Sequence, residues 1–143
     1  MTARPRPRSR TAVPRLAAPL GVLAGLGAAF AYVAAFDPNE PGHYPTCPVL
    51  SVTGFACPGC GGLRCAYAVA HGDLGAALGA NALAVAAFAL FALLWTHWFV
   101  RTARGLPYAF PVRLRAWHGW AACALTAAFT VVRNTPLGAG LTP

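Results

Sequence analysis

Residues 76–100 read AALGANALAVAAFALFALLWTHWFV and contain no charged side chain. At a rise of about 1.5 Å per residue, a helix of this length crosses the hydrocarbon core of a bilayer. Residues 16–36 and 116–132 form two further uncharged apolar runs, the last near the short end of the spanning range of about 17–25 residues. The three runs predict an all-α integral membrane fold with three transmembrane helices.

The composition also places the chain in the membrane class. Its 143 residues are 57% hydrophobic and only 10% charged, whereas soluble domains carry about 25% charged residues. Residues 1–15 are rich in Arg and Pro, cannot build a core and are expected to form a disordered basic tail. One membrane domain is expected over residues 16–136 and a C-terminal tail over residues 137–143. Basic and aromatic residues do not alternate, so no nucleic-acid partner is expected.

The distribution of arginine predicts the orientation in the membrane. Nine arginines lie in residues 1–15 and 101–115, and only Arg64 and Arg133 lie elsewhere. Because cytoplasmic segments are enriched in Arg and Lys, we expect a cytoplasmic N-terminus and an extracytoplasmic loop and C-terminus in the plasma (inner) membrane. Secretory signals have apolar regions of about 7–15 residues, so we favour an uncleaved first helix over a cleaved signal.

The outer loop, residues 37–75, carries the residues with the richest chemistry. It is dense in Pro and Gly turn signals, and residues 57–64 read CPGCGGLR. Good helix formers follow the Gly pair, which predicts a short interfacial helix over residues 63–71, with Asp73 as the N-cap of the next span. Cys123 lies in the third predicted span and is interpreted as a packing residue. The loop holds the other four cysteines: Cys47, Cys57, Cys60 and Cys65.

Three kinds of chemistry are open to the loop cysteines. Thiols outside the cytoplasm tend to oxidise, which favours a structural disulfide between Cys47 and either Cys57 or Cys60. Zinc is the second, because Cys-Pro-x-Cys-Gly resembles half of a zinc knuckle, which Cys47 with either Cys65 or His43 could complete. Thiol–disulfide exchange is the third, because free amides at a helix start stabilise a thiolate. Haem attachment is excluded because no His follows the second cysteine of the motif.

Four polar residues are expected at one depth, near the outer ends of the spans. Asn81 lies early in the second span, and Arg133 and Asn134 follow the third. Snorkelling of Arg133 and a helix C-cap at Asn134 are alternative interpretations. Together with Arg64, whose donors suit the carbonyls of the Pro-Gly turns, these residues predict a structural polar cluster that holds the Cys loop onto the helix ends.

These spaced motifs resemble the DUF2752 family of small bacterial membrane proteins. The family pattern is Cys-Pro, Thr-Gly and Cys-Pro-x-Cys-Gly-x-Thr-Arg, then Gly-Asp, Asn-Pro and a final Arg-Asn. Leu63 stands where the family often has Thr, and Ala82 stands where it has Pro, which predicts an unkinked helix. The matching residues are Cys47-Pro48, Thr53-Gly54, Cys57-Pro58-Gly59-Cys60-Gly61, Arg64, Gly72-Asp73, Asn81 and Arg133-Asn134. The resemblance covers about residues 43–136 and implies the fold and a shared site, but no activity.

Two classes of function remain open. The first is a non-enzymatic multi-pass membrane component whose Cys-rich loop is held by a disulfide or by zinc, surrounded by lipid and associated with a membrane-protein partner or a second copy. The second is a membrane thiol–disulfide oxidoreductase or metal-handling protein that uses the CPGC motif. We favour a non-enzymatic role, because the chain has only three acidic residues and carries no phosphate-binding or dinucleotide motif.

Overall fold

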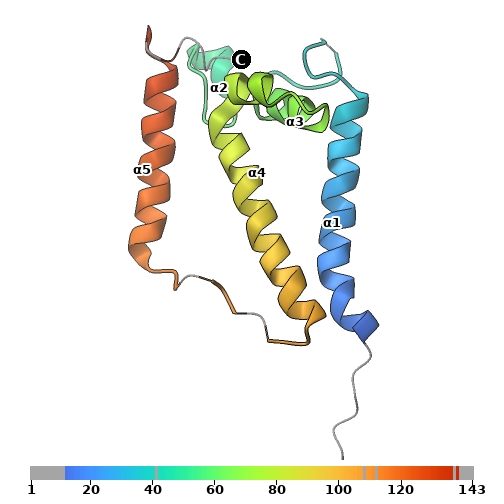
Figure 1. Ribbon diagram of the computed structural model, residues 1–143. Helices are drawn as coiled ribbons and strands as arrows, with labels where there is room; N and C mark the ends of the chain where they lie inside the picture. The colour runs from blue at the N-terminus through green and yellow to red at the C-terminus, as the bar shows by residue number, and fades with distance from the viewer. Residues whose placement is uncertain (1–11, 41, 108, 112, 137, 139–143) are drawn as a thin grey trace, which may run out of the picture.

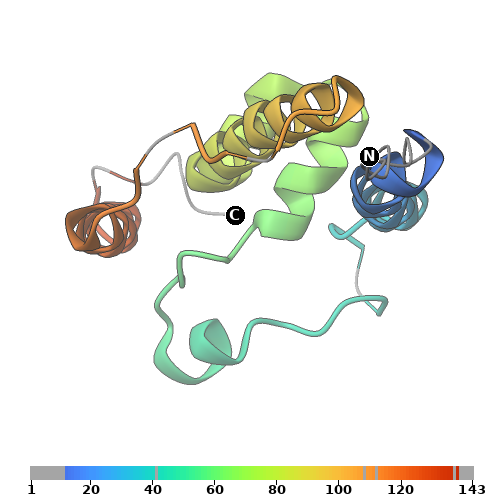
Figure 2. The ribbon, with the colours of Figure 1, turned by 90° about the horizontal axis from the view of Figure 1, so that it is seen from below.

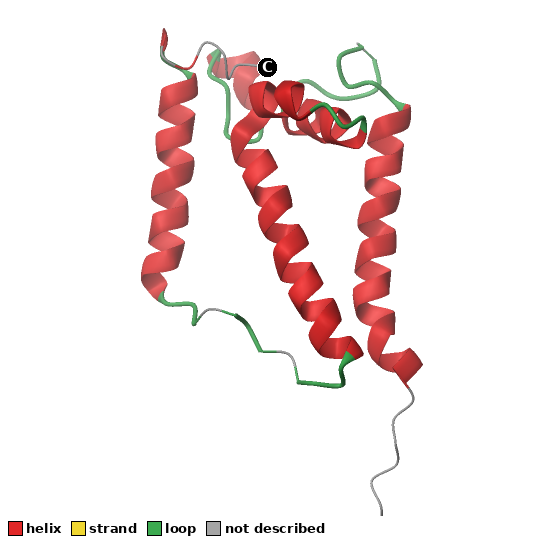
Figure 3. Ribbon diagram, viewed as in Figure 1, coloured by secondary structure: helices red, strands yellow, loops and turns green. Residues whose placement is uncertain are grey.

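The computed structural model describes residues 12–40, 42–107, 109–111, 113–136 and 138. All regular elements in these ranges are helices, as Figure 3 shows, and the predicted all-α fold is confirmed. The remaining residues of both predicted tails lie outside the described ranges. The helices are α1 (Ala12–Ala35), α2 (Pro48–Thr53), α3 (Gly62–Ala70), α4 (Leu74–Ala103) and α5 (Ala116–Arg133).

Within the described residues, two helices are long and apolar enough to cross a membrane. They are the segment Arg15–Ala35 of α1 and the whole of α4, Leu74–Ala103. The third predicted span forms α5, a helix of 18 residues, and its passage through a membrane stays a prediction. Helix α1 begins at Ala12, four residues before the predicted start. Pro14 is compatible with this start, because it falls in the first turn, where a missing amide hydrogen breaks no helical bond.

Helices α1, α3 and α4 pack against one another. Figures 1 and 2 show α3 crossing the space between α1 and α4 at the end where the Cys loop lies. Cys65, Ala68 and Ala77 form a buried cluster between α3 and α4, against which Phe88 also packs. Further along α4, the indole nitrogen of Trp95 donates a 3.0 Å hydrogen bond to a carbonyl of α1. The short helix predicted over residues 63–71 is thus present as α3, and it joins the two long helices.

Helix α5 stands apart from α4 along most of its length, as Figures 1 and 2 show. Its C-terminal end is different, because Arg133 and Asn134 form hydrogen bonds to the backbone of residues 56–60. Helix α5 is therefore tied to the Cys loop by polar contacts at one end.

Helix α4 bends at Asn81, whose φ of −165° and ψ of 94° are extended rather than helical. The expectation of an unkinked helix is therefore wrong. The side-chain oxygen of Asn81 accepts a 2.9 Å hydrogen bond from the amide of Ala84, which is the bond an N-cap residue makes to the third helical position. Asn81 thus starts a new helical segment, with Ala82 at the first position, where proline is favoured but not required. Asp73 caps the first segment in the same way, as predicted, by accepting from Ala76 at 2.8 Å.

Candidate metal centre

Three thiols from two parts of the loop over residues 37–75 meet at one point. The sulfur of Cys57 lies 3.2 Å from that of Cys60 and 3.5 Å from that of Cys47, and all three lie within 4.8 Å of one another. These separations exceed the length of a disulfide, about 2.05 Å. They are close to the ~3.8 Å that separates two thiolates on a tetrahedral zinc ion with bonds of about 2.3 Å. A small adjustment of the thiols would therefore accommodate one metal ion.

Helix α2 brings Cys47 to the CPGC motif. Cys47 immediately precedes α2, with Pro48 at its first position, and Gly54 caps the end of the helix with a φ of 72°. Such a positive φ suits glycine and strains other residues. The chain then turns back toward Cys57. The sequence analysis predicted no helix over these residues, so the element that reverses the chain was missed.

Two buried side chains hold the backbone of the motif from the helix side. The amide nitrogen of Asn81 donates to the carbonyl oxygens of Pro58 and Cys60 at 2.9 and 3.0 Å. The guanidinium of Arg133 donates to the carbonyls of Cys57 and Cys60 at 3.1 and 2.9 Å. Both side chains are only 1% exposed. Because these carbonyls are held, the positions of the Cys57 and Cys60 sulfurs relative to the helices are restricted.

Arg133 also connects the motif to the bend in α4. Its other terminal nitrogen lies 3.5 Å from the carbonyl oxygen of Ala80, the residue just before the bend, and its guanidinium carbon lies 5.2 Å from the centre of the Phe129 ring. Arg133 therefore does not snorkel toward water. Asn134 ends α5 as its C-cap and also exchanges two hydrogen bonds with the backbone of Ala56.

Two residues considered as metal ligands from the sequence take other positions. Cys65 is fully buried in the cluster between α3 and α4, and this burial raises the pKa of its thiol. His43 is exposed, and its ring lies 4.9 Å from that of Phe36. Among the described residues, the group that could hold a metal comprises Cys47, Cys57 and Cys60.

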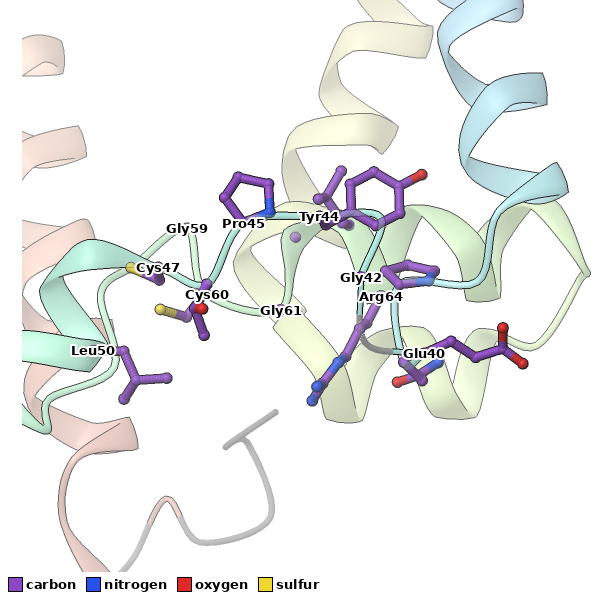
Figure 4. A pocket seen from close by; sticks show the side chains of 15 residues that line it. Glu40, Gly42, Tyr44, Pro45, Cys47, Leu50, Gly59, Cys60, Gly61 and Arg64 are labelled. Carbon is purple, nitrogen blue, oxygen red and sulfur yellow. The ribbon is translucent and has the colours of Figure 1, made fainter.

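A cavity of about 470 Å³ lies beside the thiols. Its lining includes Cys47, Cys60, Arg64 and Glu40, and Figure 4 shows the two cysteines on one side with Arg64 and Glu40 on the other. The sequence suggested that Arg64 would bind the carbonyls of the Pro-Gly turns. Asn81 and Arg133 bind carbonyls of the motif instead, and Arg64 lines the cavity.

The environment separates the acidities of the thiols. The backbone amide of Leu50, and then the thiols of Cys60 and Cys57, lower the pKa of Cys47 to about 7. Burial, and then hydrogen bonding to Cys57, raises the pKa of Cys60 to about 11. The environment therefore favours the thiolate form at Cys47 over that at Cys60.

These features define a helical protein with two candidate membrane-spanning helices and a three-thiol cluster. The family described as "Protein of unknown function (DUF2752)" matches residues 47–95, which confirms the resemblance over that segment. The matched segment begins at Cys47, contains all three clustered thiols and includes Asn81, whereas Arg133 and Asn134 lie beyond it. No curated protein and no solved structure matches the chain.

Proposed function

We propose that this chain is a non-enzymatic multi-pass protein of the plasma membrane whose outer loop is held in shape by a zinc ion bound to Cys47, Cys57 and Cys60. The convergence of the three sulfur atoms within 4.8 Å carries this proposal. A disulfide joins only two sulfurs and leaves the third without a role, whereas zinc binds several thiolates in one tetrahedral site. Metal binding to such a loop contributes directly to the free energy of folding.

The surroundings of the thiols support a metal site. Zinc with three thiolates carries a net charge of −1, and the buried guanidinium of Arg133 lies against the carbonyls of Cys57 and Cys60. A positive charge bound to the backbone of two ligand residues stabilises the anionic complex. It also favours the thiolate forms of the ligands over their protonated forms. Asn81 and Arg133 also fix the backbone that carries two of the ligands, as the groups around metal ligands commonly do.

Elemental analysis of purified protein tests the zinc site. We expect about one zinc ion per chain in the wild type, and loss of most of it in Cys47→Ser and Cys57→Ser. Cys123→Ser is a matched control, because Cys123 is exposed on α5 and should leave the zinc content unchanged. Wild-type protein without zinc, or full zinc content in Cys47→Ser, would contradict the proposal.

The arginine distribution supports the orientation and the three spans. Figure 1 shows the α1–α4 connection and the end of α5 on one side of the molecule and the α4–α5 connection on the other, an arrangement that three passes would produce.

An impermeant thiol reagent, applied to intact cells after metal chelation and mild reduction, should label the Cys loop. Labelling only after lysis would reverse the orientation. Association with lipid and with a membrane-protein partner or a second copy stays part of the proposal.

Thiol–disulfide exchange is the second candidate function. The lowered pKa of Cys47 favours it, as does the position of Cys57 beside both of the other thiols. The thiolate of Cys47 would attack one sulfur of an external disulfide, form a mixed disulfide and release the other half, which takes up a proton to become a thiol. The thiol of Cys57 would then lose its proton, attack the sulfur of Cys47, form the Cys47–Cys57 bond and release the second half as a thiol. Mass mapping of metal-free protein in a glutathione redox buffer tests this, and an absence of both the mixed disulfide and the Cys47–Cys57 disulfide would exclude exchange.

A further inference from the structure

We propose, building on the zinc site above, that the fourth metal ligand is a small anionic thiol from outside the chain, which enters the cavity beside Cys47 and Cys60 and is held by Arg64. The argument combines the number of protein ligands, the position of the cavity and the charges around it.

The ligand count leaves a fourth position for an external donor. Zinc is almost always four-coordinate, and sites with three protein ligands take a water or substrate in the fourth position. Among the described residues, three side chains converge on the site. Cys65 is packed in the core between α3 and α4, and His43 lies against Phe36. Neither of these side chains is placed to complete the coordination.

The cavity gives such a donor access to the site. Its volume of about 470 Å³ lies within the range of small-molecule pockets, about 300–1,000 Å³. Two of the three ligands, Cys47 and Cys60, belong to its lining, and so do the glycines at positions 59, 61 and 62. A side-chain carbon added at Gly62 would meet no atom within 4 Å. Open space therefore lies at Gly62, whereas a side-chain carbon added at Gly59 would lie 3.8 Å from the sulfur of Cys57.

The charges around the cavity select an anion. A thiolate added to a zinc ion with three thiolates makes the net charge of the complex more negative, from −1 to −2, and nearby positive charge stabilises such a complex. Arg64 lines the cavity, and Arg133 lies behind the motif. Figure 4 shows the carboxylate of Glu40 directed away from the two cysteines. A ligand with a thiolate at one end and a carboxylate at the other would coordinate the metal through its sulfur and pair with the guanidinium of Arg64 through its carboxylate.

Cobalt substitution provides the test, because the visible spectrum of Co²⁺ reports its ligands. Purified protein loaded with Co²⁺ would be titrated with 3-mercaptopropionate and with cysteamine, a thiol of similar size that carries an ammonium group. We expect 3-mercaptopropionate to bind at least about tenfold more tightly. Arg64→Gln should remove this preference without changing the Co²⁺ content, and Arg64→Lys should retain part of it. Arg104→Gln, an equal change of charge near the other end of α4, should leave the preference intact.

The outcomes distinguish this inference from the proposal on which it rests. Protein that binds no Co²⁺ overturns both. Protein that binds Co²⁺ through the three cysteines, but prefers neither thiol or keeps its preference in Arg64→Gln, overturns the inference and leaves the metal site standing. A changed Co²⁺ spectrum in ligand-free Glu40→Gln would assign the fourth position to Glu40 and would also overturn it.

Discussion

The side-chain amide of Asn134 forms two hydrogen bonds with the backbone of Ala56, one through its oxygen and one through its nitrogen. The oxygen of Asn134 accepts from the amide of Ala56 at 2.8 Å, and the nitrogen donates to the carbonyl of the same residue at 2.9 Å. This pair of bonds joins the end of α5 to the residue just before the CPGC motif. Because α5 stands apart from α4 along most of its length (Figure 1), the motif and α5 depend on each other for their positions.

Replacing Asn134 should loosen the Cys loop. Asn134→Asp keeps an acceptor for the amide of Ala56 but loses the donor, and Asn134→Ala loses both. Each unsatisfied buried group costs about 1–3 kcal/mol, so we expect lower melting temperatures in detergent and faster alkylation of Cys57, with the larger effect for Ala. Asn39→Ala is the control, because Asn39 is exposed and bonds only locally to Asp37. Equal melting temperatures for Asn134→Asp, Asn134→Ala and Asn39→Ala would show that the hydrogen bonds between Asn134 and Ala56 contribute little to stability.

Removing the amide of Asn81 should also release the motif. Asn81→Asp keeps the oxygen that caps Ala84 but loses the donors to the carbonyls of Pro58 and Cys60. Asn81→Leu loses all three bonds, although leucine is the better residue in contact with lipid. We expect both variants to lose zinc to a chelator faster than the wild type, with Leu the more severe. Unchanged chelation and expression in Asn81→Leu would identify Asn81 as a tolerated polar residue.

A proline in α4 should leave the protein stable at position 82 and destabilise it at position 87. Ala82 is the first residue after the Asn81 cap, and Asn81 already has the extended backbone that precedes proline. Ala82→Pro should therefore be neutral or stabilise the protein by about 0.4–1 kcal/mol. Ala87→Pro, inside the second segment, should cost about 3 kcal/mol or more. Thermal unfolding of the two variants tests the bend, and equal destabilisation would contradict it.

Alkylation of the metal-free, reduced protein should depend on pH in a different way for each thiol. The thiolate is the reactive form, and the pKa of Cys47 is lowered to about 7, so its rate should fall about fivefold from pH 7 to pH 6. Cys60 has a pKa raised to about 11 and should stay mostly protonated up to pH 9. Mass mapping after brief iodoacetamide treatment measures both rates. Cys60 reacting before Cys47 at pH 7 would contradict this order.

Local signals in the sequence were enough to predict most of the helices. Uncharged apolar runs of sufficient length indicated α1, α4 and α5, and the Gly pair before good helix formers indicated α3. Asp73 was recognised as an N-cap because its bond to Ala76 spans only three residues. The spacing of Cys57 and Cys60 likewise placed two thiols in one turn. Each of these features depends on residues that are neighbours in the chain, so the sequence by itself determined them.

Only the tertiary structure decided which residues complete the site. The sequence favoured Cys47 as the partner of the motif and left Cys65 or His43 as a further metal ligand; α2 turns Cys47 toward the motif, while the packing of α3 on α4 buries Cys65. Arg64 and Arg133 were both expected near the motif, and Arg133, 73 residues from Cys60 along the chain, binds its carbonyl. The bend at Asn81 also depends on distant partners, because the motif accepts its amide hydrogens. Which side chains contact the motif depends on how the helices pack against one another. That packing forms only when segments far apart in the sequence come together.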